Sequence, residues 1–468
     1  MGQAQLKQND RDSVKTYNPA TGELYKTYAL HTKEEADAIV NDAHKAYLSW
    51  KKTTFEERAK IINKIGDIFE EQKTELAQMV TRQMGKPIEQ AEGEVDVCIA
   101  ICRYTAKNGA DFLADEKREI EGGKKGIITY QPLGVILGMQ PWNFPLYQCV
   151  RYSLAVIMAG NSTVFKHATI CFETAEKIQQ IYEQAGLPED VFSVVYVQDE
   201  TADELISHDK VQGVTFTGSA KAGKIIAKEA GAHLKKLVLE LGGSDPYIIL
   251  KDANLDEIID ICVQGRVNNG GQTCIAAKRF IVEDEIYDEF KERFVKAMKA
   301  VKYGDPMDRD NDMGPLARED LRETLHKQVQ ETIQKGAKCL CGGEIPKDKN
   351  GYFYPATVLE DIPKDSPAYD DELFGPVAAL FRATDEDNAL DIANDHRYGL
   401  GGGVMSGDEE KALKVAKAIE TGIVNVNNYG LALPNMPFGG VKESGYGREH
   451  GGFGLREFVN VKAILVGE

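Results

Sequence analysis

The stretch VTFTGSAKAGKIIAKEA, residues 214–230, decides the fold class of this 468-residue chain. Its first four residues are a β-branched and aromatic run typical of a strand, Gly218 and Ser219 form a turn, and the rest has helical spacing. A strand that passes through a tight turn into a helix is the repeating unit of parallel α/β sheets. Such a turn also directs backbone N–H groups and the positive end of the helix dipole at a phosphate.

Similar units lie on both sides of this stretch. Short apolar runs occur at residues 135–139, 163–166, 192–197 and 237–241, and helical segments such as 147–159 and 172–184 separate them. We therefore predict a parallel sheet with helices on both faces, whose ligands bind beyond the carboxyl ends of the strands. A second alternating set follows in residues 247–427, with helices at 284–301 and 408–420.

The segments outside these two alternating sets have other patterns. Residues 32–115 have helical periodicity, whereas residues 122–130 and the closing run FVNVKAILV, residues 458–466, predict extended edges that need partners. We therefore expect subunit pairing, as a homodimer or homotetramer.

Composition excludes several classes of protein. Seventy-four acidic against 56 basic residues give a net charge of −18, which repels nucleic-acid backbones. The eight cysteines lack the paired CxxC spacing of zinc sites, so we predict no metal and reduced thiols in the cytoplasm. The N-terminus has no apolar signal-peptide core, and no apolar run approaches the ~18 residues of a membrane span.

The turn at Gly218 has three interpretations. The dinucleotide fingerprint GxGxxG is missing, yet a strand, turn and helix that bind a phosphate remain. Residues 218–224 are one position short of a phosphate-loop NTPase motif, but Ile225 lacks the hydroxyl that would hold Mg²⁺. A turn without any ligand is the third interpretation. Lys166 ends another strand and suits a ribose or phosphate, or is a surface lysine at the sheet edge.

Three residues suit covalent chemistry on an acyl carbon. Cys274 lies in NGGQTCIAAK, residues 269–278, and Glu240 ends the run KKLVLE. A thiolate can attack the carbon, and a carboxylate can then activate water. Asn143 is held in the rigid turn PWNFP, where one amide donor to an oxyanion contributes ~3 to 4 kcal/mol. Alone, Cys274 would more often be a buried core thiol and Asn143 a turn residue.

Together these motifs resemble the aldehyde dehydrogenase superfamily, closest to its succinate-semialdehyde dehydrogenase branch. The resemblance covers the chain from about residue 15 to its end and rests on Lys166 and on PWNFP (141–145), FTGS (216–219), ELGG (240–243), GQTC (271–274), ELFGP (372–376) and PFGGVKESGYGRE (437–449). It implies an α/β fold of two doubly wound parallel-sheet domains, one of them Rossmann-like, with a β-arm for oligomerisation. The implied boundaries are a cofactor-binding domain at 1–114 and 132–241, a catalytic domain at 242–435, an arm and terminal strand at 115–131 and 455–468, and a returning segment near the active site at 436–454.

The resemblance also implies roles for single residues. Cys274 would attack an aldehyde to give a thiohemiacetal, with Asn143 and the Cys274 N–H holding the oxyanion. Hydride would leave to the nicotinamide, and Glu240 would activate the water that hydrolyses the thioester. The residues implied at the cofactor are Trp142, Lys166, Thr169, Gly218, Ser219, Leu241, Glu372 and Phe374.

Thr169 departs from the family pattern. NAD-preferring members usually carry a glutamate three residues after the lysine, and a carboxylate there would repel a 2′-phosphate, whereas a threonine would not. We predict NADP or NAD as the cofactor, with NADP accepted and a preference for NADP as a hypothesis.

The substrate evidence centres on Arg151. It matches an arginine that succinate-semialdehyde dehydrogenases use to hold the distal carboxylate, but it could equally pair with a helix carboxylate. A second arginine of some members is Asn268 here, with Arg266 two residues further off, and Ala432 lies near the place of a usual serine. We favour succinate semialdehyde as the substrate. Lactaldehyde, a CoA-acylating enzyme and a catalytically silent binding protein are the alternatives, although Glu240 favours water over CoA.

Overall fold

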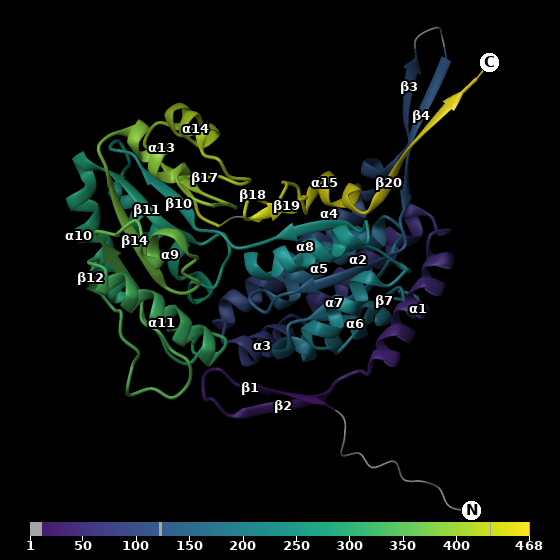
Figure 1. Ribbon diagram of the computed structural model, residues 1–468, viewed down its shortest axis with the longest axis horizontal. Helices are drawn as coiled ribbons and strands as arrows, with labels where there is room; N and C mark the ends of the chain where they lie inside the picture. The colour runs from purple at the N-terminus through teal and green to yellow at the C-terminus, as the bar shows by residue number, and fades with distance from the viewer. Residues whose placement is uncertain (1–11, 121–123, 431, 468) are drawn as a thin grey trace, which may run out of the picture.

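The computed structural model describes residues 12–120, 124–430 and 432–467. Figure 1 shows two lobes, each built on its own sheet, and a narrow arm that projects from one of them. Parts of three predictions fall outside the described residues: the polar N-terminus at 1–11, the start of the arm at 122–123, and residue 468 of the terminal segment.

The first lobe contains the sheet predicted around residues 214–230. Its strand order is β19-β9-β8-β5-β6-β7, and every pair is parallel except β19 with β9. Each predicted run of this region contains a strand, although the run at 192–197 is a strand only over Phe192–Val194, and β19 is an added antiparallel edge. The strands are β5 (Val135–Gln140), β6 (Ser162–His167), β7 (Phe192–Val194), β8 (Val211–Thr217), β9 (Lys236–Glu240) and β19 (Gly445–Tyr446).

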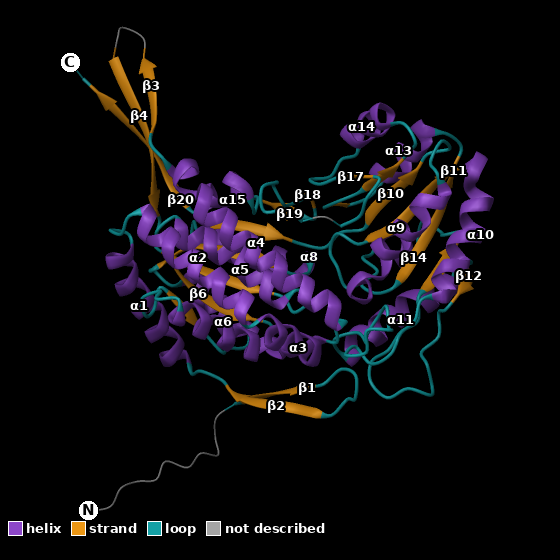
Figure 2. Cartoon of the chain, turned by 180° about the vertical axis from the view of Figure 1, so that it is seen from behind, coloured by secondary structure: helices purple, strands orange, loops and turns teal. Residues whose placement is uncertain are grey.

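Helices cover both faces of this sheet (Figure 2) because successive side chains of a strand point to opposite faces. Ile136 packs with one set of helices, among them α2, α4, α5 and α6, whereas Val135 and Leu137 pack with α1, α7 and α8. The helices of this lobe are α1 (Lys33–Trp50), α2 (Phe55–Glu71), α3 (Lys73–Met84), α4 (Ile88–Leu113), α5 (Pro145–Met158), η1 (Thr169–Cys171), α6 (Phe172–Gln184), α7 (Asp199–Ser207), α8 (Ala220–Ala232) and α15 (Gly451–Glu457).

The second lobe repeats the design with strand order β12-β13-β14-β11-β10-β16-β17 and an antiparallel edge at β12. Ile248 and Ile249 face opposite layers of its core. Its strands are β10 (Asp245–Ile249), β11 (Ala277–Glu283), β12 (Lys338–Cys341), β13 (Thr357–Glu360), β14 (Val377–Ala383), β16 (Gly403–Met405) and β17 (Asn425–Val426). Its helices are α9 (Leu255–Val267), η2 (Asn268–Gly271), α10 (Asp284–Ala300), α11 (Glu319–Gln334), α12 (Pro367–Asp370), α13 (Glu386–Asn394) and α14 (Glu409–Ala418).

The arm is a sheet of β3 (Glu116–Ile120), β4 (Lys124–Pro132) and the terminal β20 (Val459–Val466). One expectation is corrected here, because β4 is the central strand and pairs with both neighbours, leaving β20 and β3 as the edges. Local pattern cannot reveal this pairing, since β20 arrives from the far end of the chain. Short pairs complete the fold: β1 (Ser13–Tyr17) with β2 (Leu24–Ala29), and β15 (Tyr398–Gly399) with β18 (Val441–Lys442).

Candidate active site

The loop that carries Cys274 is shaped by three consecutive residues with positive φ. Asn269, Gly270 and Gly271 have φ of 55°, 62° and 73°, so the chain turns back at the end of α9 before β11 begins. A Cβ on Gly271 would lie 2.3 Å from the carbonyl oxygen of Gly375. Only glycine allows this approach, which packs the GQTC turn directly on the backbone of the ELFGP segment.

The Asn143 turn interlocks with that loop. The Asn143 amide nitrogen donates to the carbonyl of Gln272 at 3.0 Å, and the Asn269 amide nitrogen donates to the carbonyl of Asn143 at 2.8 Å. Asn143 is 3% exposed, so its rotamer is held by its surroundings. An amide nitrogen carries two N–H groups, and therefore one remains for an oxyanion that forms beside Cys274.

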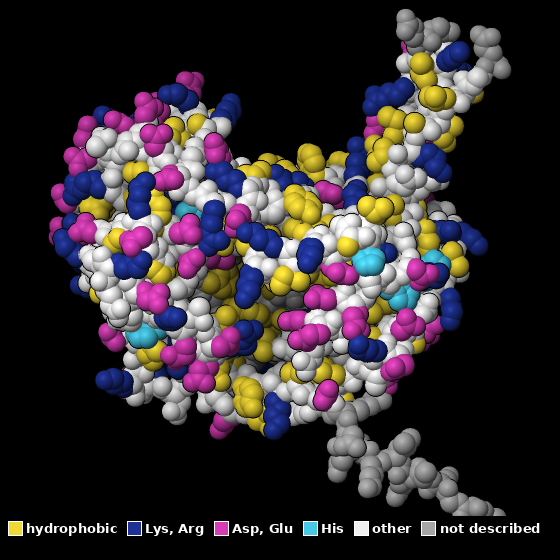
Figure 3. Space-filling view, in the orientation of Figure 1, with side chains coloured by type: hydrophobic (Ala, Val, Ile, Leu, Met, Phe, Trp, Pro, Cys, Tyr) yellow, Lys and Arg dark blue, Asp and Glu magenta, His cyan; other side chains and the backbone are white. Residues whose placement is uncertain are grey.

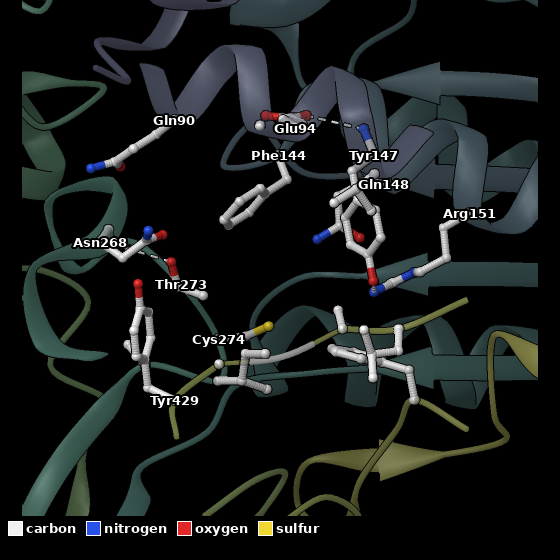
Figure 4. Close-up of a pocket in the computed structure, with 18 of the residues that line it drawn as sticks. Gln90, Glu94, Phe144, Tyr147, Gln148, Arg151, Asn268, Thr273, Cys274 and Tyr429 are labelled. Carbon is white, nitrogen blue, oxygen red and sulfur yellow. Dashed lines mark hydrogen bonds between the residues drawn. The ribbon is translucent and has the colours of Figure 1, made fainter. Parts of the chain in front are cut away.

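Two cavities meet at Cys274. The larger, of about 370 Å³, is lined by α5 side chains and by the loop on either side of the cysteine. Figure 4 shows the Cys274 sulfur directed toward the space below Phe144, Gln148 and Tyr147. The smaller cavity, of about 240 Å³, shares only Cys274 and Gln148 with the larger one. A carbonyl group in one cavity and a hydride acceptor in the other would therefore flank the same thiol.

Most residues predicted at the cofactor lie around the smaller cavity. Ser219 caps α8 by accepting from the Ala222 N–H at 3.2 Å, so the helix dipole points at this space. Lys166 and Thr169 are not among its lining residues and lie further along the same sheet edge, at the end of β6 and in η1. The predicted cofactor residues that line the cavity are Trp142, Gly218, Ser219, Leu241, Glu372 and Phe374, and the predicted catalytic residue Asn143 lines it as well.

Two buried cations, Lys278 and Arg151, are the neighbours that favour the thiolate form of Cys274. Burial raises its pKa to about 12, and the positive charges of Lys278 and Arg151 lower it. Lys278 has a side chain 1% exposed, and its ammonium donates to the Cys274 carbonyl at 2.7 Å and the Thr273 carbonyl at 3.1 Å. The same ammonium lies 3.5 Å from a carboxylate oxygen of Glu372. Lys278 therefore joins the backbone at the thiol to the smaller cavity.

Glu240 ends β9 and is 2% exposed, and it is not among the residues that line the two cavities at Cys274. Neither of its carboxylate oxygens has a hydrogen-bond partner in the described part of the chain. A Cβ on Gly439 would lie 2.7 Å from one of these oxygens, so the glycine-rich returning segment covers the carboxyl. Burial raises the pKa of Glu240 well above its usual range, and the charge of Glu449 raises it further, so this carboxyl binds a proton more tightly than a solvated one.

Arg151 lines the larger cavity and is also paired inside the protein. Its guanidinium forms an ion pair with Glu449, and it donates to Thr217 at 3.2 Å and to the Tyr147 hydroxyl at 3.4 Å. The ring of Phe438 lies 4.7 Å from the guanidinium carbon. The carboxylate partner is thus in the returning segment and not on a helix. Because Arg151 also lines the larger cavity, its contact with a substrate carboxylate stays a prediction.

The structure also shows where the other three residues near the predicted substrate site lie. Asn268 and Ala432, the two departures from the resemblance noted in the sequence, both line the larger cavity. Arg266 is fully buried and donates to the Gly271 carbonyl at 2.8 Å, so it supports the cysteine loop from below and does not replace the missing arginine. The described residues contain no group of three or more His, Cys, Asp or Glu that could hold a metal ion.

Some residues of the site were missed in the sequence. Lys278 and Glu449 lie inside two of the sequence motifs, and the structure shows that both are buried. The only signal in the sequence was a charged residue beside the apolar or glycine-rich part of each motif. Lys86 and Glu94 form a fully buried ion pair, and Glu94 lines the larger cavity. Helical periodicity alone does not distinguish such a pair from a solvated one.

The chain belongs to the aldehyde dehydrogenase family, whose model matches residues 6–464. Among its relatives, a succinate-semialdehyde dehydrogenase [NADP(+)] of Mycobacterium avium is 43% identical over 97% of both chains. A probable succinate-semialdehyde dehydrogenase [NADP(+)] of Synechocystis is 41% identical over 97% of this chain and 100% of its own. The crystal structure of succinic semialdehyde dehydrogenase from Streptococcus pyogenes with NADP+ is 37% identical, covers 97% of this chain and all of its own, and has a TM-score of 0.95. These matches confirm the predicted family and fold.

Proposed function

We propose that this aldehyde dehydrogenase oxidises succinate semialdehyde to succinate with NADP+ or NAD+. The observation that carries the proposal is the position of Cys274 between two cavities, one suited to an aldehyde and one to a cofactor. The relatives named above support the substrate and NADP+, because they match along nearly the whole chain.

The smaller cavity fits a nicotinamide cofactor. The N-terminus of α8 offers N–H groups to a pyrophosphate, and Gly242 lets the Glu372 carboxylate approach the backbone, because a Cβ there would lie 2.4 Å from a Glu372 oxygen. Ser219 and Lys166 would hold the phosphates and ribose, and Glu372 and Phe374 would hold the nicotinamide end. When bound, the cofactor supplies the acceptor for the hydride that leaves the substrate carbon.

The protein's own residues carry the other steps. The Cys274 thiol first gives up its proton to solvent, and the thiolate then attacks the aldehyde carbon. The carbonyl electrons move to oxygen, and the Asn143 amide and the Cys274 N–H hold that oxyanion. Loss of hydride leaves a thioester on Cys274. Glu240 takes a proton from water as the water oxygen attacks the thioester carbon, and the sulfur leaves as the thiolate. The product is a carboxylate.

One observation at the distal end of the substrate favours a second candidate. Arg151 already pairs with Glu449, and the larger cavity is otherwise lined mainly by aromatic and aliphatic side chains such as Phe144 and Phe438. A small uncharged aldehyde such as lactaldehyde needs no free cation. A CoA-acylating activity is the weaker alternative, because Glu240 is present to activate water.

The test is a panel of short aldehydes assayed with both cofactors for the wild type, Cys274→Ser and Arg151→Ala. Succinate semialdehyde should have the highest kcat/KM, Cys274→Ser should abolish turnover, and carboxylate should form without CoA. Arg151→Ala should raise KM for succinate semialdehyde far more than for an uncharged aldehyde of similar length. Higher kcat/KM for lactaldehyde in the wild type would replace the substrate assignment.

The same proposal extends to assembly and compartment. We infer that the arm joins copies of the chain into a homodimer or homotetramer, because the edge strand β20 exposes Val461, Ile464, Leu465 and Val466. Apolar side chains gather on this arm in Figure 3.

The domain boundaries given above are part of the proposal, with residues 436–454 as the segment that covers Glu240. All eight cysteines are free, which supports a reducing cytoplasm, and no described helix is both long and apolar enough to cross a membrane.

A further inference from the structure

An ion pair lies at the carboxyl edge of the first sheet, beyond the two cavities. Lys166, the second-to-last residue of strand β6, donates to a carboxylate oxygen of Asp199, the first residue of α7. The Lys166 side chain is 11% exposed and that of Asp199 is 88% exposed. Thr169 follows Lys166 in η1, so these three side chains belong to one end of the sheet.

The sheet register relates this ion pair to the phosphate-binding turn. Met139 of β5 pairs with Lys166 on one side and with Phe216 of β8 on the other. Lys166 and the end of β8 therefore stand at the same level of the sheet, two strand spacings or about 10 Å apart. Ser219 and the start of α8 follow β8 directly. A dinucleotide with its pyrophosphate at α8 would place its adenosine ribose near Lys166.

We propose that Asp199 sets the choice between NADP+ and NAD+ by competing with the 2′-phosphate of NADP+ for Lys166. This inference rests on the proposed use of either cofactor. NADP+ carries on the adenosine ribose a phosphate that NAD+ lacks, and a phosphate monoester is a doubly charged anion near pH 7. Such an anion can bind the Lys166 ammonium only if the Asp199 carboxylate yields its place, and the two negative groups repel each other at short range.

Asp199 is the carboxylate in direct contact with Lys166, whereas Asp203 of the same helix acts on the Lys166 charge without an ion pair to it. Thr169 is neutral and can donate a hydroxyl to a phosphate, so the usual obstacle to NADP+ is missing at that position. Because Asp199 is exposed, its carboxylate costs little to displace, and NADP+ remains acceptable while its affinity is reduced. NAD+ has no phosphate here and is expected to be insensitive to the charge of residue 199.

The test measures cofactor binding directly, by isothermal titration of the full-length protein with NADP+ and with NAD+ in the absence of aldehyde. Asp199→Asn keeps the size of the side chain and removes its charge. We expect Kd for NADP+ to fall about threefold to tenfold, with Kd for NAD+ changed less than twofold. Glu200→Gln is the matched control, because it removes one negative charge from the same exposed turn without touching the Lys166 pair, and it should change neither Kd appreciably.

Two results would overturn the inference. One is an unchanged Kd for NADP+ in Asp199→Asn, or a change matched by Glu200→Gln. The other is a large loss of NAD+ affinity in Asp199→Asn, which would mean that the carboxylate holds the ribose hydroxyls. If the proposed function itself fails, the wild type will bind neither cofactor, and this outcome is distinct from both.

Discussion

The buried ion pair between Lys86 and Glu94 offers a quantitative test of how the Asn143 turn is held. Both side chains have 0% exposure. One Glu94 oxygen accepts from the backbone N–H groups of Leu146 at 2.8 Å and Tyr147 at 3.0 Å, at the start of α5, which has no side-chain cap of its own. Glu94 therefore caps the helix that begins two residues after Asn143.

The informative change is Glu94→Gln, which preserves the shape and an acceptor oxygen but removes the charge. The Lys86 ammonium is then left buried without its partner, which costs about 3 to 5 kcal/mol. Weaker hydrogen bonds from the α5 N–H groups to a neutral oxygen add about 1 kcal/mol. We expect the free energy of unfolding to fall by about 4 to 6 kcal/mol in total, and kcat to fall because the Asn143 amide loses its fixed position.

Urea unfolding followed by tryptophan fluorescence measures this loss, because both tryptophans, Trp50 and Trp142, are buried in the core of this lobe. Asp96→Asn is the control on the same helix. Asp96 pairs with Lys73 at 2.7 Å, but the two side chains are 58% and 35% exposed, so the expected loss is below about 1 kcal/mol. A loss for Glu94→Gln no larger than that of Asp96→Asn would refute the reasoning. Adding Lys86→Met to Glu94→Gln should recover part of the stability, since the unpaired charge is removed.

Three further predictions concern the chemistry. Lys278→Met should raise the pKa of Cys274, already raised to about 12 by burial, because a nearby positive charge is lost. Alkylation of Cys274 by iodoacetamide, followed by peptide mass spectrometry, should then need a higher pH. An unshifted pH profile would contradict the role given to Lys278. Asn143→Ala should lower kcat about 100-fold to 1000-fold with little change in cofactor Kd, and a loss confined to KM would speak against oxyanion binding. Thr169→Glu should lower kcat/KM for NADP+ at least about tenfold by charge repulsion while sparing NAD+; equal losses with both cofactors would point to a structural effect.

Much of the fold could be predicted because it depends on local patterns. The helix expected at residues 172–184 is α6, and the turn at Gly218 and Ser219 leads into α8 as its spacing indicated. Runs of apolar residues marked the strands because parallel strands are buried on both faces. The pairing of β4 with β20 was not predictable in this way, since period and composition do not say which distant strand completes a sheet.

For the site, the amino-acid sequence by itself determined which groups are available: a thiol after a glycine turn, an amide in a proline-bounded turn, and a carboxylate at the end of a strand. Only the tertiary structure decided what these groups meet. Asn143 and Gln272 are 129 positions apart yet share a hydrogen bond, and the buried partners Glu449 for Arg151 and Glu372 for Lys278 come from other segments. The reason is physical: short-range patterns record how a segment satisfies its own backbone, whereas burial and charge pairing depend on which segments the packed core brings together.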